Sequence, residues 1–164
     1  MRCILHILQT FSAETAYCYW RANFKHSLQK PLIVIGAQMA ADEPGSDVQI
    51  QLTNSIRVAS AFVRHDVVGV YNVCIGDVWD GSRVRKRAES NFMAFYTPGR
   101  YPVARVWPSI HFDEGLRYKD PVQAIQGLRI DSALEPNVAY FRVSADTPPW
   151  VVMDLVKNNR IKGV

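Results

Sequence analysis

Two consecutive prolines near the end of the chain constrain its fold more than any other feature. Pro148–Pro149 stand between a strand-like run, Asn137–Ser144, and an amphipathic run, Trp150–Asn159. Proline suits the first position of a helix, because the N–H that it lacks would have no partner there. Thr147 just before them, or Asp146, is a suitable N-cap. We therefore predict a strand over Asn137–Ser144, a tight turn and a helix over Trp150–Asn159. A strand over the β-prone Trp150–Met153 is the alternative, which the two prolines disfavour.

One stripe of this predicted helix is apolar. Val152, Leu155 and Val156 recur at helical spacing, and Lys157 lies near the negative end of the helix dipole. We expect the apolar stripe to pack on a sheet.

The composition is that of an ordinary globular protein. The chain has 164 residues, of which 48% are hydrophobic and 21% are charged. A chain of this length is typical of one domain, and no apolar run reaches the roughly 18 residues of a membrane span. We predict a single α+β domain with a mixed or antiparallel sheet of about five to seven strands and three or four helices.

Three segments follow one another along the chain. Residues 1–38 carry an expected helix and a buried strand, Leu32–Ile35, and either belong to the main domain or flank it. Residues 39–47 are rich in Asp, Glu, Pro and Gly, which predicts a loop. Residues 48–164 then form the main α+β domain. The sequence does not decide whether Met1 or Met39 is the functional start.

Several β-branched and aromatic runs predict further strands. A short strand is expected over Val48–Leu52. Ile56–Val63 and Val67–Cys74 read as a β-hairpin around a polar turn at Arg64–Asp66. Two more strands are expected over Asn91–Tyr96 and Val103–Trp107. The predicted core consists of Ile33, Ile35, Val58, Val68, Val70, Phe95, Val103, Phe141 and Val143.

A basic cluster is the strongest charge feature of a chain whose formal net charge is +4. Cations neutralise phosphates, and nearby aromatic side chains stack on bases. This predicts a nucleic-acid-binding site formed by Arg83, Arg85, Lys86, Arg87 and Arg100. The alternative is a solvated surface, which is the more common use of such a run.

Other candidate sites are weaker. His111, Asp113 and Glu114 suggest a metal or acid–base site, and the alternative is the polar end of a strand. The three cysteines, Cys3, Cys18 and Cys74, have no zinc-type spacing, so we expect no metal and reduced thiols in the cytoplasm. No G-x-S-x-G, P-loop or G-x-G-x-x-G motif occurs, so the hydrolase and nucleotide-binding classes have no positive signal.

Two stretches resemble the GNAT-type N-acyltransferase superfamily. Arg57–Tyr71 resembles that family's central hairpin, in which a polar turn leads into an apolar strand with a glycine. Val143–Lys157 resembles its late strand and the following helix, which covers the cofactor. The resemblance implies a mixed sheet and an N-acyltransferase that uses acetyl-CoA or another acyl-CoA.

The chain departs from that family where phosphates would bind. The family has a basic residue followed by closely spaced glycines, whereas Asp113–Gln123 has one glycine and begins with acidic residues. Asp146 stands in place of the usual turn Asn, and Asp154 in place of a tyrosine often used as general acid. The resemblance therefore implies a divergent or inactive enzyme and carries over no catalytic residue.

Two other classes remain open. One is a non-enzymatic basic module, for nucleic acid or a protein partner, centred on Arg83–Arg87. The other is an accessory or structural protein of a virus or mobile element. The expected partner is anionic, either nucleic acid or CoA, and the sequence does not define an oligomeric state.

Overall fold

The computed structural model describes residues 28–113, 115–118, 136–139, 141 and 143–163, together with the backbone of residues 4–7. The chain divides into two compact units, Met1–Ser132 and Ala133–Val164, which we treat separately.

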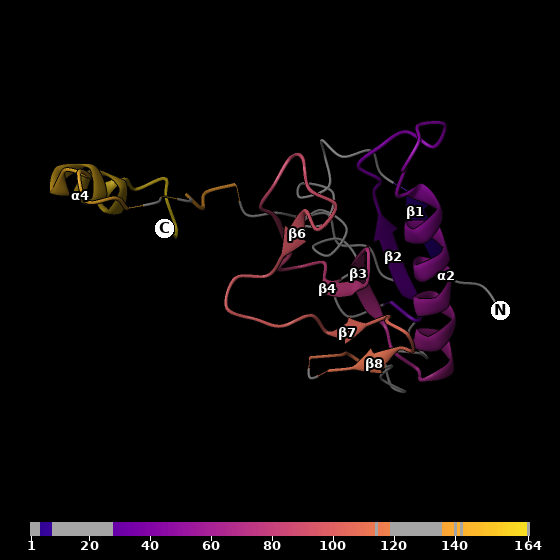
Figure 1. Ribbon diagram of the computed structural model, residues 1–164. Coiled ribbons are helices and arrows are strands. Elements are labelled where there is room, and N and C mark those ends of the chain that lie inside the picture. Colours follow the sequence, from indigo (N-terminus) through magenta and orange to yellow (C-terminus); the bar gives the residue numbers. More distant parts are fainter. Residues whose placement is uncertain are drawn as a thin grey trace. The chain divides into compact units, whose positions relative to one another are not determined.

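A mixed sheet forms the first unit (Figure 1). Its strand order is β1-β2-β3-β4-β7-β8, in which the first three strands are parallel and the later neighbours are antiparallel. A separate pair joins β5 and β6. The α+β fold with a mixed central sheet is thus confirmed. The strand bounds are β1 Ile4–Ile7, β2 Pro31–Ile35, β3 Gly69–Cys74, β4 Asp77–Asp80, β5 Arg85–Lys86, β6 Phe95–Tyr96, β7 Ala104–Arg105 and β8 His111–Phe112.

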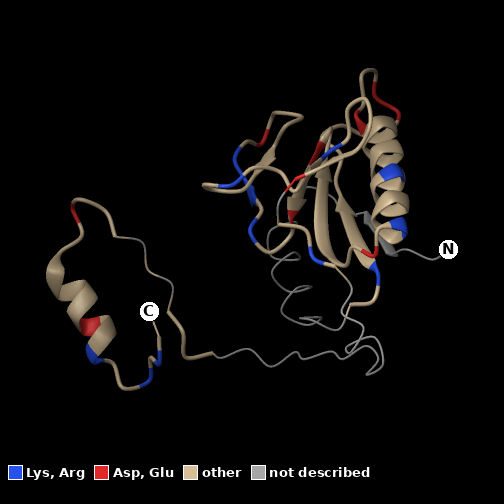
Figure 2. Ribbon diagram, turned by 90° about the horizontal axis from the view of Figure 1, so that it is seen from below, with Lys and Arg blue, Asp and Glu red and all other residues tan. Residues whose placement is uncertain are grey.

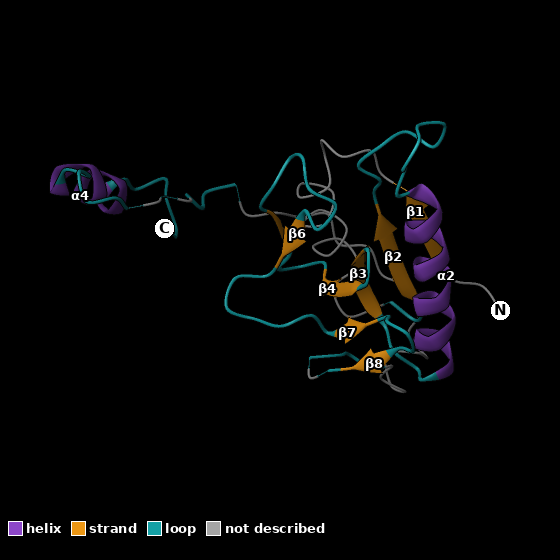
Figure 3. Ribbon diagram, in the orientation of Figure 1, coloured by secondary structure: helices purple, strands orange, loops and turns teal. Residues whose placement is uncertain are grey.

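Helix α2, Val48–Arg64, connects β2 to the parallel strand β3 and covers one face of the sheet (Figure 3). The strands predicted over Val48–Leu52 and Ile56–Val63, and the hairpin that joined the second of them to β3, are therefore wrong. The buried residues of α2 recur at helical spacing, but the first three are polar: Gln51, Asn54, Ser55, Val58, Ala59, Ala61 and Phe62. Because three of these buried residues are polar, apolar residues alone do not show the helical periodicity of α2.

Other strand predictions hold: β2 begins one residue earlier than predicted, and the rest have shorter bounds. β2 matches the buried run Leu32–Ile35, and β3 lies within Val67–Cys74. The runs Asn91–Tyr96 and Val103–Trp107 each contain a two-residue strand, β6 and β7.

The core lies between α2 and the sheet. Phe62 is fully buried, and its ring meets that of Tyr71 edge to face, with centroids 4.9 Å apart. Most of the predicted core is buried, namely Ile33, Ile35, Val58, Val70, Phe95 and Val103. Val68 and Phe141 are only half-buried and Val143 is 67% exposed, so these three predictions are wrong.

Because of Tyr71, the free energy of unfolding varies with pH in the alkaline range. Its hydroxyl donates to Val68 O at 2.9 Å, and burial raises the pKa of Tyr71 from 10.0 to about 12. The folded state therefore favours the neutral phenol, so its stabilising effect is present below pH 10 and is lost as the pH rises toward 12. From about pH 9 to about pH 11, the wild type should lose about 1 kcal/mol of unfolding free energy more than Tyr71→Phe. Urea titrations of both proteins at each pH measure this difference, and parallel loss in both would contradict it.

The second unit contains helix α4, Pro149–Lys157, which confirms the predicted helix. Pro148 occupies the N-cap position, and no side chain caps the first turn. Thr147 instead closes the preceding turn, because its Oγ1 accepts from Ser144 N at 2.8 Å. The predicted strand Asn137–Ser144 lies partly outside the described residues, and a single bridge pairs Val138 with Gly163. Packing of the stripe through Val152, Leu155 and Val156 on a sheet stays a prediction.

Candidate functional site

The carboxyl ends of the parallel strands form one edge of the sheet. In open sheets with parallel strands, ligands bind in the crevice outside these ends. At this edge, β2 leads into the loop of residues 36–47 and β3 leads into the turn Ile75–Gly76 (Figure 1). We define the carboxyl-edge site as this loop, this turn and Lys86, which is linked to the loop through Glu89.

Asp47 holds the loop after β2 in place. Its carboxylate accepts hydrogen bonds from the backbone N–H groups of Gln38, at 2.9 and 3.0 Å, and of Met39, at 3.1 Å. Asp47 is only 5% exposed and directly precedes α2, where the helix dipole favours a negative charge. The loop after β2 is therefore fixed to the start of α2.

Two buried amides of α2 hold the turn after β3. Ile75 is a β-branched residue with a φ of 57°, a conformation that costs about 1–3 kcal/mol for such a residue. Gln51 Oε1 accepts from Ile75 N at 2.9 Å, and Asn54 Nδ2 donates to Ile75 O at 2.5 Å. Gln51 Nε2 also donates to Asp47 Oδ2 at 3.4 Å, which links the turn to the loop. Strain of this kind clusters at functional sites, so the turn supports the choice of this edge.

Lys86 brings a positive charge to the same edge. It lies on β5, where its side chain is 11% exposed, whereas its neighbour Arg85 is exposed. Lys86 Nζ pairs with Glu89 Oε2 at 2.6 Å. The backbone carbonyl of Glu89 accepts from the Gln38 side-chain amide, which connects this pair to the loop after β2. The edge thus combines a largely buried ammonium group with a rigid loop.

This arrangement is suited to a ligand that carries or develops negative charge. A fixed ammonium group in a partly dry site stabilises a carboxylate or a developing oxyanion. We assign no nucleophile among the described residues.

The structure separates the predicted basic cluster. The β5 alternation turns Lys86 inward and Arg85 outward, while Arg87 N pairs with Ala94 O at 2.8 Å. Arg83 and Arg100 line a pocket elsewhere in this unit. Figure 2 shows Lys and Arg on α2 and also on the loops across the sheet from it.

The predicted site at His111 and Asp113 does not gather ligands. His111 is exposed on β8, and its Nε2 lies 3.1 Å from Ser109 Oγ. In the part of the chain that the structure describes, no group of three His, Cys, Asp or Glu side chains could hold a metal. Glu114 lies outside the described residues.

The sequence does not predict the role of several residues of the carboxyl-edge site. The pattern predicts a loop at Asp47 and a strand over Val48–Leu52, which contains Gln51 and ends two residues before Asn54. The available signal was the position of Asp47 directly before a stripe of helical spacing, which is where an acidic residue favours a helix start.

Comparison with known proteins now defines the family. The model of the N-terminal domain of asparaginases matches residues 12–118, which is more than half of the chain. The chain belongs to the asparaginase family.

Curated relatives agree with this assignment. A glutamyl-tRNA(Gln) amidotransferase subunit from Pyrococcus abyssi is 29% identical over 142 residues, which cover 84% of this chain and 32% of the relative. The protein of the same name from Pyrococcus horikoshii is 33% identical over 123 residues, which cover 71% of this chain and 27% of the relative. The chain therefore spans about a third of the length of these relatives.

Solved structures support the fold. The thermostable L-asparaginase of Thermococcus kodakarensis superposes with a TM-score of 0.71 at 20% identity, covering 94% of this chain and 44% of that one. L-asparaginase I of Vibrio cholerae superposes with a TM-score of 0.72 at 15% identity, covering 96% and 46%.

The family assignment overturns the functional predictions. The resemblance to N-acyltransferases is wrong, because Arg57–Tyr71 is the end of α2 followed by a parallel strand and not a hairpin. An acyl-CoA-dependent function and a nucleic-acid-binding module both conflict with the asparaginase match. The absence of a linear hydrolase motif carries no weight against the family, because a site assembled from separate loops needs no such motif. Among the described helices, none is long and apolar enough to cross a bilayer.

Proposed function

We propose that the chain is part of an amidohydrolase that acts on the side-chain amide of an amino acid such as asparagine or glutamine. In this reaction water adds to the amide carbon, the C–N bond breaks, and the products are a carboxylate and ammonia. The family match and the names of the asparaginases and amidotransferase subunits support this reaction class.

The observation that carries the proposal is the position of Lys86. Its ammonium group lies at the carboxyl-edge site, where ligands bind in folds of this type, and it is connected through Glu89 to the loop after β2. We assign Lys86 the role of the cation that faces the negative charge developing on the amide carbonyl oxygen. The chain spans about a third of its curated relatives, so we propose only part of an active site here.

Lys86→Met tests the proposal. A charge-assisted contact of this kind accounts for a factor of about ten or more, so we expect at least that loss in ammonia release from asparagine or glutamine. Glu89 is 73% exposed on its side chain, so its carboxylate stays hydrated and the variant should remain folded. Arg85→Gln is the matched control, since it removes one charge from the exposed side of the same strand.

Ammonia release and thermal stabilisation by each amino acid would be measured for all three proteins. Stabilisation by the substrate reports binding to the folded state even where turnover is slow. The proposal fails if neither amide stabilises the wild type against heat, or if Arg85→Gln is impaired as much as Lys86→Met. A preference for glutamine would align the chain with the amidotransferase subunits, and a preference for asparagine with the asparaginases.

A further inference from the structure

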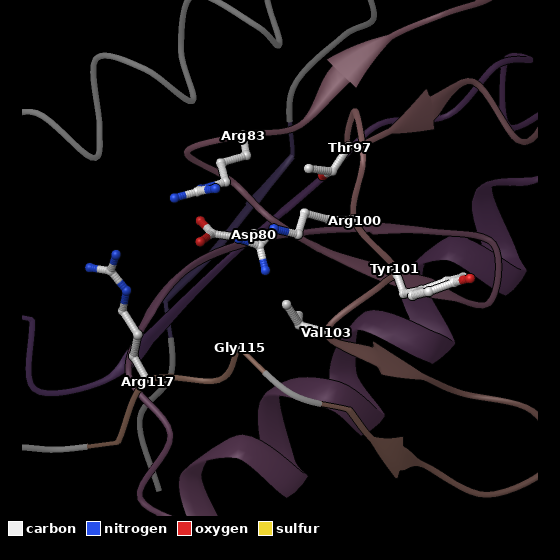
Figure 4. A pocket seen from close by; sticks show the side chains of 8 residues that line it. All are labelled: Asp80, Arg83, Thr97, Arg100, Tyr101, Val103, Gly115 and Arg117. Atoms are coloured by element: carbon white, nitrogen blue, oxygen red, sulfur yellow. The ribbon is translucent and has the colours of Figure 1, made fainter.

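A second site lies away from the carboxyl-edge site. Of the residues that the structure describes, eight line a pocket with a volume of about 290 Å³: Asp80, Arg83, Thr97, Arg100, Tyr101, Val103, Gly115 and Arg117 (Figure 4). Asp80 ends β4 and is paired with Tyr71 in the first half of β3, whereas the carboxyl-edge site follows the last residue of β3, Cys74. The pocket is therefore set toward the opposite end of β3.

The side chains of the pocket are strongly cationic. Figure 4 shows the guanidinium groups of Arg83 and Arg100 beside Asp80 and that of Arg117 apart from them, whereas the ring of Tyr101 points away. Among the described lining residues, three arginines and one aspartate give a formal charge of +2 (3 − 1 = 2). Guanidinium groups bind carboxylate and phosphate oxygens through paired hydrogen bonds.

The backbone positions of two of these arginines are fixed. Arg117 N donates to Tyr71 Oη at 3.3 Å, and Arg117 O accepts from Val68 N at 2.7 Å. Arg83 N donates to Asp80 O at 3.0 Å. These two arginines therefore extend exposed side chains from ordered backbone, and no backbone rearrangement is needed for them to meet a ligand.

Thr97 adds an unsatisfied polar atom to the same wall. The residue is 7% exposed, and its buried Oγ1 has no hydrogen-bond partner among the described residues. A buried hydroxyl without a partner is unfavourable, and such groups in native structures call for an explanation. Oγ1 is closed to solvent in this structure, so a ligand oxygen would become its partner once the Thr97 side chain turned toward the pocket.

We propose that this pocket binds a small dianion, either a phosphate monoester or inorganic phosphate, or a dicarboxylate. The two sources share the chemistry that the pocket recognises, namely two negative charges borne on oxygen atoms. The charge of +2 among the described lining residues favours a dianion, and the volume is close to the lower limit for ligand pockets. The site is separate from the amide-hydrolysing site proposed above and does not depend on it.

Isothermal titration of the full chain with inorganic phosphate and, separately, with malate tests this proposal. We expect saturable binding of at least one of them at millimolar concentration, and the stronger ligand identifies the source. Arg100→Gln should weaken binding about tenfold, in line with the loss of one charge-assisted contact. The matched control is Arg64→Gln, which removes an exposed arginine of α2 and should leave binding unchanged. Lys86→Met should also leave it unchanged, which separates this pocket from the carboxyl-edge site.

Thr97→Val provides a second test, in which the melting temperature and the affinity for the dianion should respond differently. The substitution keeps the shape of the side chain but removes the hydroxyl that has no partner, so the melting temperature of the ligand-free protein should stay the same or rise. Dianion binding should nevertheless weaken. The proposal is overturned if neither dianion binds, if Arg64→Gln weakens binding as much as Arg100→Gln, or if Thr97→Val lowers the melting temperature and leaves binding unchanged.

Discussion

Phe62→Ala is expected to lower the free energy of unfolding by about 3–5 kcal/mol. Phe62 is fully buried between α2 and the sheet, and its ring contacts those of Tyr71 and Phe112, with centroids 4.9 and 5.9 Å away. Truncation to alanine removes this apolar surface from the core and leaves a cavity that close-packed neighbours fill only in part. Urea denaturation followed by circular dichroism measures the loss.

The matched control for this substitution lies on the same helix. Ile56 belongs to α2 but is 54% exposed, so Ile56→Ala should change stability by no more than about 0.5 kcal/mol. A third variant, Phe62→Leu, keeps most of the apolar volume and should fall between the two. Equal losses for Phe62→Ala and Ile56→Ala would show that α2 does not pack on the sheet through this stripe.

The elements that the sequence predicts correctly are those with a strong local signal. β2 is a run of five buried residues, and such short apolar runs are typical of strands covered on both faces. Helix α4 begins at the predicted double proline. In both cases the residues that determine the structure are neighbours in the chain.

Helix α2 shows why local patterns can mislead. Val48, Ile50 and Leu52 alternate with glutamines as in a strand, yet Ile50 is 37% exposed on the helix. The stripe that faces the sheet begins with the polar residues Gln51 and Asn54, because these amides hold the strained turn after β3. The structural role of these amides therefore interrupts the apolar periodicity from which a helix is predicted.

Both candidate sites depend on contacts between distant parts of the chain. Arg83 and Arg100 were predicted as binding residues, but Arg117, which completes the pocket, joins them only through the fold. Lys86 was predicted as part of a surface cluster, and only its pairing on β5 shows that it turns inward. The sequence therefore indicates which cationic residues are candidates for binding, whereas only the structure shows which of them lie in the same site.

Asp47→Ala is expected to lower the free energy of unfolding by about 2–4 kcal/mol and to release the loop after β2. The carboxylate is almost fully buried and accepts from Gln38 N, Met39 N and the Gln51 side chain. Removing it leaves these donors without a partner, and each unsatisfied buried group costs about 1–3 kcal/mol unless water reaches it. Urea denaturation measures the loss, and hydrogen exchange of the Gln38 and Met39 amides reports on the loop.

Asp47→Asn separates the role of shape from that of charge. The asparagine keeps one acceptor oxygen but loses the negative charge at the start of α2, so its effect should be smaller than that of alanine. Because Gln38 also donates to the Glu89 carbonyl, release of the loop should loosen the position of Lys86 as well. Asp47→Ala should therefore weaken binding of the amide substrate, even though Asp47 itself is buried. If the Gln38 and Met39 amides exchange as slowly in Asp47→Ala as in the wild type, Asp47 does not hold this loop, and the carboxyl-edge site must be rigid for another reason.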